Sequence, residues 1–183
     1  AIEMRADVET CLRELDRETI DIFHLHFVRS TEDMRLREDA LNVLVQCKEA
    51  GMIRAIGISS HGIQGAACAL EYNEIDVVFP LLNRKGLGLL DGSPEDLIDV
   101  IKELRADNRG LYDMKPLGGG HLIDDIPAAI KYLRDLDLFA SISAATESTL
   151  LMLVSAYAST PLMHQAYETA IQQRYRFYSF GVA

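Results

Sequence analysis

Short apolar runs alternate with amphipathic segments along the chain. From Met4 to Leu15 the apolar residues recur at steps of three and four, which predicts a helix packed on one face. The next run, Ile20 to Val28, is rich in β-branched and aromatic residues and is too short for a typical helix, so it predicts a buried strand. The same pairing of a strand with a helix then repeats down the chain.

Four more strands are predicted by apolar runs, at Ile53 to Ser59, Ile75 to Pro80, Gly110 to Lys115 and Phe139 to Ala144. Amphipathic patterns predict helices at Glu38 to Ala50, His61 to Tyr72, Pro94 to Arg105, Ile126 to Leu136 and Ser148 to Ala158, and a final one from Pro161 to about Tyr175. The clearest helix start is Ser93-Pro94-Glu95-Asp96, which has a capping residue, a proline suited to the first turn and an acid three residues after the cap. A chain in which each strand is followed by its own helix is typical of parallel βα units.

Composition narrows the class of protein further. The 183 residues, 49% apolar and 25% charged, are enough for one domain with a full hydrophobic core. The net charge of −10 argues against nucleic acid and anionic membranes as partners. Cys11, Cys47 and Cys68 are far apart and odd in number, which argues against a disulfide framework, and the most apolar stretch is about half as long as a bilayer span. We therefore expect a cytoplasmic protein.

Candidate chemistry lies where the predicted strands end. Right-handed crossovers place the carboxyl ends of parallel strands on one edge of the sheet, where α/β proteins bind ligands. In chain order these ends carry His26; Ser59, Ser60 and His61; Pro80 and Asn83; Lys115; and Thr146 and Glu147. The amino ends carry mostly charged residues that we expect to be solvated, namely Asp21, Arg54 and Asp76. The carboxyl edge is therefore the expected ligand site.

His24 and His26 are two residues apart in a predicted strand, so both rings are expected on the same face of the sheet. An imidazole beside a carbonyl group can orient it or donate a proton, and a His-x-His pair can also hold a divalent metal. Either histidine can instead be an ordinary core residue. The pattern leaves these interpretations open.

A glycine-rich loop follows the fourth predicted strand, where Lys115-Pro116-Leu117 leads into Gly118-Gly119-Gly120. Without side chains, a loop lets a ligand approach the backbone closely, and glycine-rich loops after strands often bind phosphates. Lys115 can be a phosphate contact, a catalytic amine or a residue at the edge of the sheet. The sequence does not distinguish these roles.

Three stretches resemble the aldo-keto reductase family in order and spacing. Thr19 to His26 (TIDIFHLH) is similar to the family's strand that ends in the active-site histidine, and Ile53 to Ser60 (IRAIGISS) resembles its Lys-Ile-Arg-x-Ile-Gly-Val-Ser-Asn strand. Lys115 to Gly120 (KPLGGG) is similar to its Ser-Pro-Leu-Gly-x-Gly loop over the cofactor. The likeness runs from Ala1 to about Ala158.

The resemblance implies an α/β fold that is a partial (β/α)8 TIM barrel, with about five parallel βα units plus a leading and a C-terminal helix. It implies an oxidoreductase that transfers hydride between NAD(P)H and a small-molecule carbonyl substrate. By the same resemblance, His26 is the catalytic histidine that orients the substrate carbonyl, and Ser59 and Ser60 hold the nicotinamide carboxamide. The cofactor's pyrophosphate is then expected along Lys115, Pro116, Leu117, Gly118 and Gly120.

Several residues depart from the family's pattern. Ser60 replaces the usual Asn, and Met114 stands where an aromatic residue often stacks on the nicotinamide. NADP is the expected cofactor, but Glu147 lies near the usual place of a basic residue for the 2′-phosphate, so NAD is the alternative. The loop Asn83 to Asp91 and the triple glycine look closest to a prokaryotic branch whose members often continue into a ferredoxin-like module, for which this chain has no cysteine cluster.

The likeness begins at the helix before the family's fourth strand, so that three strands are missing from a barrel that needs about 250 residues. The family's Asp, Tyr and Lys belong to the missing part, and we expect the chain to be inactive alone. Ala1 in place of Met fits a piece of a longer protein. We expect a partial barrel domain at residues 1–158 and a helical extension at 159–183, with a homo-oligomer or an upstream segment closing the barrel.

Two other functions remain open on the residues alone. A metal-dependent hydrolase would use His24 and His26 as paired ligands, with Lys115 and His121 near the same edge. A non-catalytic binding or assembly module would instead pair through the open edges of an incomplete sheet.

Overall fold

The computed structural model describes residues 2–136 and 140–142. In these ranges one parallel sheet has the strand order β1-β2-β3-β4-β5. The strands are β1 (Ile20–Leu25), β2 (Ile53–Ser60), β3 (Val77–Pro80), β4 (Gly110–Met114) and β5 (Ala140–Ile142). The α-helices are α1 (Ile2–Leu15), α2 (Thr31–Arg35), α3 (Glu38–Glu49), α4 (Ile63–Ala67), α5 (Pro94–Ala106) and α6 (Ile126–Asp135), and 3-10 turns span η1 (Cys68–Glu71), η2 (Gly118–Gly120) and η3 (Ile123–Asp125).

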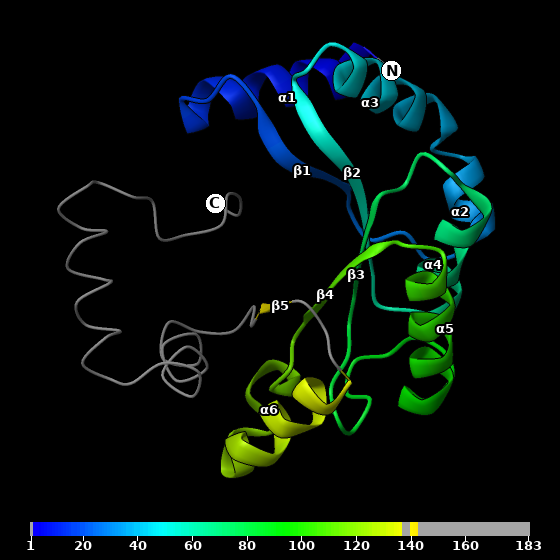
Figure 1. Cartoon of the computed structure of the whole chain (residues 1–183), viewed down its shortest axis with the longest axis vertical. Coiled ribbons are helices and arrows are strands. Elements are labelled where there is room, and N and C mark those ends of the chain that lie inside the picture. The colour runs from blue at the N-terminus through cyan, green and yellow to red at the C-terminus, as the bar shows by residue number, and fades with distance from the viewer. Residues whose placement is uncertain (1, 137–139, 143–183) are drawn as a thin grey trace, which may run out of the picture.

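The strand order distinguishes this sheet from a doubly wound one. A doubly wound sheet reverses its strand order in the middle and carries helices on both faces. Here each strand pairs with the next along the chain, so successive right-handed crossovers put their helices on the same face. Figure 1 shows α1, α3, α4 and α5 together on one side of a curved sheet. The fold is therefore part of a (β/α) barrel wall, as the sequence predicted.

The main hydrophobic core lies between the sheet and these helices. Alternate strand residues such as Leu25, Ile56 and Val78 point to the helices and are at most 3% exposed. From the helix side, Leu44 and Leu104 are fully buried against the same cluster. The intervening strand residues point to the other face of the sheet, which we call the inner face.

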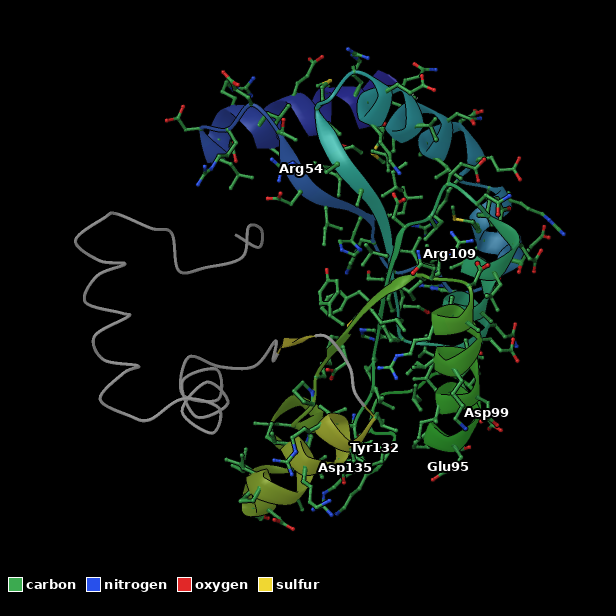
Figure 2. The ribbon with its side chains drawn as sticks, in the orientation of Figure 1. Arg54, Glu95, Asp99, Arg109, Tyr132 and Asp135 are labelled. Atoms are coloured by element: carbon green, nitrogen blue, oxygen red, sulfur yellow. The ribbon has the colours of Figure 1, made fainter. Side chains whose placement is uncertain are left out.

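Ion pairs occupy the amino ends of the strands. The guanidinium of Arg54 in β2 lies 2.6 Å from the carboxylate of Asp21 in β1. The Lys48 ammonium lies 2.6 Å from the Asp76 carboxylate, which also accepts the Ile56 backbone N–H. Figure 2 labels Arg54 and also Arg109, which directly precedes β4.

Arg109 is 8% exposed and donates hydrogen bonds to the backbone carbonyls of Tyr72 and Ile75. Together with the ion pairs, these bonds fix the turns at the amino edge of the sheet.

The predicted elements that fall in the described ranges are present, with several differences. β3 begins at Val77 rather than Ile75, and the 3-10 turns η2 and η3 were not predicted. β1 ends at Leu25 rather than Val28, because Phe27 adopts a left-handed backbone conformation (φ 59°) and the chain turns there. The predicted helix at 61–72 divides into α4 and η1, and the short helix α2 was not predicted. The predicted helices at 148–158 and 161–175, Thr146, Glu147 and the proposed division at residue 158 lie outside the described residues.

No helix in the described ranges is long and apolar enough to cross a bilayer.

Candidate functional site

The turn after β1 is hydrogen-bonded to the end of β2. The Phe27 backbone N–H donates to Ser59 Oγ at 2.9 Å, and the Val28 N–H donates to the Ser59 carbonyl at 2.8 Å. Arg37, paired with Asp33 at 3.0 Å, donates to the His26 carbonyl at 2.8 Å. These bonds position the exposed His26 side chain at the carboxyl edge while engaging only its backbone.

Ser59 and Ser60 face opposite sides of the sheet because they are consecutive residues of a strand. The Ser59 side chain is 3% exposed and lies on the inner face, and accepting the Phe27 N–H leaves its hydroxyl further capacity for a ligand.

Ser60 lies on the helix side, 1% exposed. Its hydroxyl donates to the Gly62 carbonyl at 2.8 Å and accepts from the Gly62 N–H at 3.0 Å. The structure therefore brings Ser59, and not Ser60, to the inner face.

The loop Lys115 to Gly120 combines a buried base with an open tip. Leu117 is fully buried in a small core cluster with Leu122, and Pro116 is also buried. Gly118, Gly119 and Gly120 all have positive φ (57°, 65° and 97°). A Cβ at Gly119 or Gly120 would meet no atom within 4 Å, so a ligand could approach this backbone closely.

Lys115 and His61 meet at the same edge. Lys115 Nζ lies 3.3 Å from His61 Nε2, and because an ammonium can only donate, the imidazole nitrogen is the acceptor. Burial lowers the pKa of His61, and electrostatic interactions with Lys115 and His26 lower it further. The two groups that act on His61 come from the ends of β4 and β1, so the edge brings these predicted site residues together.

His24 is in a different environment from His26. Its Nε2 lies 2.5 Å from the Tyr112 hydroxyl, and its ring lies tilted against Phe79, 5.9 Å between centroids. Phe79 and Tyr112 are stacked at 4.2 Å. Burial lowers the pKa of His24 to about 4, partly opposed by the Ile58 backbone. His24 is thus a neutral residue of the inner face at neutral pH.

Asn83 organises the loop that follows β3. Its fully buried side chain donates to the Leu87 carbonyl at 2.9 Å and accepts from the backbone N–H groups of Leu87 and Lys85 at 3.0 and 3.3 Å. These bonds give Asn83 a structural role at the strand end.

The described residues include no group of three or more His, Cys, Asp or Glu side chains that could hold a metal ion. Because His24 Nε2 is bonded to Tyr112, no observation within the described ranges favours the paired-ligand hydrolase.

Two features of this edge were missed by sequence reasoning. The Tyr112–His24 contact joins residues 88 positions apart, and the ring of Phe27 lies edge-on to His61 with centroids 4.9 Å apart. For the Phe27 contact, the one available sequence signal was that an aromatic residue directly follows His26. Nothing in the sequence indicates the partner of His24.

Comparison with known proteins now defines the class. Residues 2–153 match the model of the aldo/keto reductase family. The chain belongs to the aldo/keto reductase family.

The fold agrees with solved structures of that family. An aldo-keto reductase from Bacillus halodurans in its holo form is 19% identical with a TM-score of 0.64, and the match covers 97% of this chain and 68% of that one. A Pseudomonas aeruginosa protein assigned to the aldo-keto reductases is 23% identical with a TM-score of 0.61, over 78% of this chain and 52% of that one. The chain thus spans about half the length of this solved structure. At these identities the likeness shows the fold alone.

The last part of the chain matches a second family model. Residues 143–183 match the model of the queuosine biosynthesis protein, which overlaps the reductase match at residues 143–153.

Short stretches of the chain are similar to curated S-adenosylmethionine:tRNA ribosyltransferase-isomerases. The protein of Natranaerobius thermophilus is 62% identical over 37 residues, which is 20% of this chain and 11% of that protein. That of Ralstonia pickettii is 50% identical over 50 residues, which is 27% of this chain and 14% of that protein. These matches cover a small part of each relative.

Proposed function

We propose that this chain is the cofactor- and substrate-binding part of an oxidoreductase that transfers hydride between NAD(P)H and a small-molecule carbonyl compound. One observation carries the proposal: His26, Ser59 and the glycine loop lie at the carboxyl edge of a single parallel sheet in a chain of the aldo/keto reductase family. The carboxyl edge is where barrel enzymes hold their substrates. Cytoplasmic location remains part of the proposal.

The residues at this edge fit a dinucleotide. The open backbone of Gly119 and Gly120 gives room for a pyrophosphate, and the Lys115 ammonium supplies a positive charge beside it. Ser59 Oγ on the inner face can hold the nicotinamide carboxamide. When bound, NAD(P)H supplies the hydride. We propose NADP as the cofactor, with NAD as the alternative.

The other predicted contacts have distinct places in this proposal. Gly118 and Gly120 provide loop backbone, while the buried Pro116 and Leu117 anchor the loop to the core. The carboxamide contact of Ser60 stays a prediction. In the structure the Ser60 hydroxyl lies on the helix side, where it is hydrogen-bonded to the Gly62 backbone.

His26 is the proposed residue that orients the substrate carbonyl. Its ring is exposed at the edge, and its backbone is held by Arg37. Hydride transfer builds negative charge on the carbonyl oxygen, so a hydrogen-bond donor at that oxygen lowers the barrier. A proton donor in addition to His26 is expected from a segment that completes the barrel or from a second copy. We therefore propose that turnover by this chain alone is weak.

Binding of NADPH tests this proposal without requiring turnover. We expect NADPH fluorescence to change saturably on titration with the chain, and Ser59→Ala to weaken that affinity about tenfold, equivalent to about 1.4 kcal/mol. Thr10→Ala on α1, which also removes a hydroxyl, is the control and should leave the affinity unchanged.

Thermal melts should show that Ser59→Ala still folds, because Ser59 also binds the Phe27 N–H. Absence of saturable NADPH binding by a folded chain would contradict the proposal. Rapid aldehyde reduction by the chain alone would instead contradict the need for a completing segment.

A further inference from the structure

Nitrogen-bearing side chains gather near one aromatic ring, that of Phe27, at the carboxyl edge. The His61 ring lies edge-on to Phe27, with centroids 4.9 Å apart, and the Arg29 guanidinium lies 4.9 Å from the centroid of the same ring. Lys115 Nζ reaches His61 Nε2 at 3.3 Å. Three separate chain segments thus bring nitrogen donors to one place.

Burial lowers the pKa of His61, and Lys115 and His26 lower it further. Among the described residues, none of these causes is an acidic group. The neighbouring acids are engaged elsewhere: Asp91 accepts the backbone N–H of Ile63, and Asp33 is paired with Arg37. In a chain with a net charge of −10, the two cations Arg29 and Lys115 beside the Phe27–His61 pair favour an anionic ligand at this place.

Backbone strain coincides with the cluster. Four non-glycine residues of the described ranges have positive φ, and two of them, Asp16 and Asn108, are of types that tolerate it. The other two are Phe27 and Lys115, both with φ of 59° and both directly in the cluster. Strain of this kind persists where surrounding bonds enforce it, and it concentrates at functional sites.

The bonds that enforce the strain are present at both residues. Phe27 donates its N–H to Ser59 Oγ at 2.9 Å, and the Lys115 carbonyl accepts the Gly118 N–H at 2.8 Å. The fold therefore holds the backbones of Phe27 and Lys115 in place before any ligand arrives.

We propose that His61 and Lys115 form a binding site for an anionic group, a phosphate or a carboxylate, on a ligand at this edge. This inference deepens the proposed function, because the anion is then either a cofactor phosphate or an acidic group of the carbonyl substrate. The ammonium donates directly, and His61 becomes a second donor when the anion favours its protonation.

Inorganic phosphate is the probe that tests the site. The ring protons of His61 are followed by NMR in the full chain at constant ionic strength set with chloride, and His61→Gln identifies the signal. We expect a saturable shift of the His61 signal and an increase in its apparent pKa with phosphate. Lys115→Met keeps the aliphatic stem and should weaken phosphate binding at least tenfold. Lys102→Met, on the exposed face of α5, should bind as the unsubstituted chain does.

Two outcomes overturn the proposal. One is a shift that rises without saturation, and the other is equal phosphate affinity in Lys115→Met and Lys102→Met. If Lys115→Met fails to fold, His61→Gln replaces it, with the ring signals of His26 as the readout. Unchanged phosphate affinity in that variant also overturns the proposal.

A second titration, at saturating NADPH, identifies the source of the anion. Loss of phosphate binding and a shift of His61 caused by NADPH itself assign the site to the cofactor. Retained phosphate binding assigns it to an acidic substrate. If NADPH does not bind but phosphate does, the cofactor proposal fails while the anion site stands, so the two failures are distinguishable.

Discussion

At the scale of single residues, His24 and His26 show how position along one strand sets chemistry. His24 is enclosed by Phe79, Tyr112 and the neighbouring strand, and a Cβ at Gly57 would lie 2.3 Å from its ring. The ring therefore fits only beside a glycine. Two residues further on, the chain has reached the carboxyl edge and His26 is exposed. The same side chain is structural at the first position and available to a ligand at the second.

The environment of His24 predicts that acid destabilises the fold. Its pKa of about 4 in the folded chain lies below the ordinary 6.5 expected after unfolding, so between these values the unfolded chain binds more protons. The stabilisation from neutral His24 is complete above pH 6.5 and is lost as the pH falls towards 4. The difference corresponds to roughly 3 kcal/mol. Urea unfolding at pH 7, 6, 5 and 4 measures it.

His24→Leu is the matched variant for this prediction, because leucine has no titrating group. Its free energy of unfolding should depend less on pH in that window than that of the unsubstituted chain. Equal pH dependence in the two proteins would show that other groups cause the acid sensitivity.

The residues of the candidate edge could largely be predicted because strand ends are visible in the sequence. His26, Ser59 and Lys115 each follow an apolar run, and parallel pairing brings such ends to one edge. Residue type alone could not distinguish the structural roles of Ser60 and Asn83 from the ligand-binding roles expected of the other residues at this edge. Those roles depend on the bonds to Gly62 and Leu87, which exist only after the turns have formed.

At the scale of elements, local sequence signals determine the helix starts. The Ser93 hydroxyl accepts the Asp96 N–H, and the Asp96 carboxylate accepts the Ser93 N–H at 2.9 Å, which is the capping box expected from Ser93-Pro94-Glu95-Asp96. The start of α2 has only the first of these two bonds: Ser30 accepts the Asp33 N–H at 3.2 Å, and the Asp33 carboxylate accepts the Arg29 N–H instead. With five residues, α2 is too short to show helical periodicity, so this cap alone was not recognised.

The cap of α5 gives a prediction at this scale. Ser93→Ala removes the acceptor for one N–H of the first turn and should lower the free energy of unfolding by about 1 kcal/mol. Chemical denaturation at neutral pH measures this change. Asn42→Ala, at an exposed position within α3, is the control and should change stability by less than about 0.5 kcal/mol. An equal loss in both variants would mean that the cap contributes nothing specific.

Close packing between elements was beyond the reach of the sequence. A Cβ at Gly65 in α4 would lie 2.1 Å from the Val28 carbonyl and 2.3 Å from Ser60 Oγ. The helix therefore approaches the turn after β1 at a point where only glycine fits. In the sequence, Gly65 is one more small residue in an alanine-rich stretch, and nothing there shows what lies opposite it.

At the scale of the whole molecule, the sheet has a helix-covered face and an aromatic inner face. Phe79 and Tyr112 stack on the inner face beside His24, and Ile22, 38% exposed, shares that face by strand alternation. Within the described strands, β1 pairs with β2 alone.

The two ends of the chain match different families, at residues 2–153 and 143–183. The chain therefore combines similarity to the aldo/keto reductase family with similarity to the queuosine biosynthesis protein.

The partly exposed inner face and the edge of β1, which has no second partner strand within the described ranges, predict self-association. An apolar face beside an unpaired strand edge favours contact with another polypeptide, and a charge that points inward from an edge strand opposes it. Light scattering of the purified chain should therefore show a mass that increases with concentration in the micromolar range. Ile22→Lys should shift the distribution towards the monomer. Ile123→Lys, at a 48% exposed isoleucine on η3, adds the same charge elsewhere and should leave association unchanged. A monomer at every concentration, or equal effects of the two lysines, would mean that the inner face is not the contact surface.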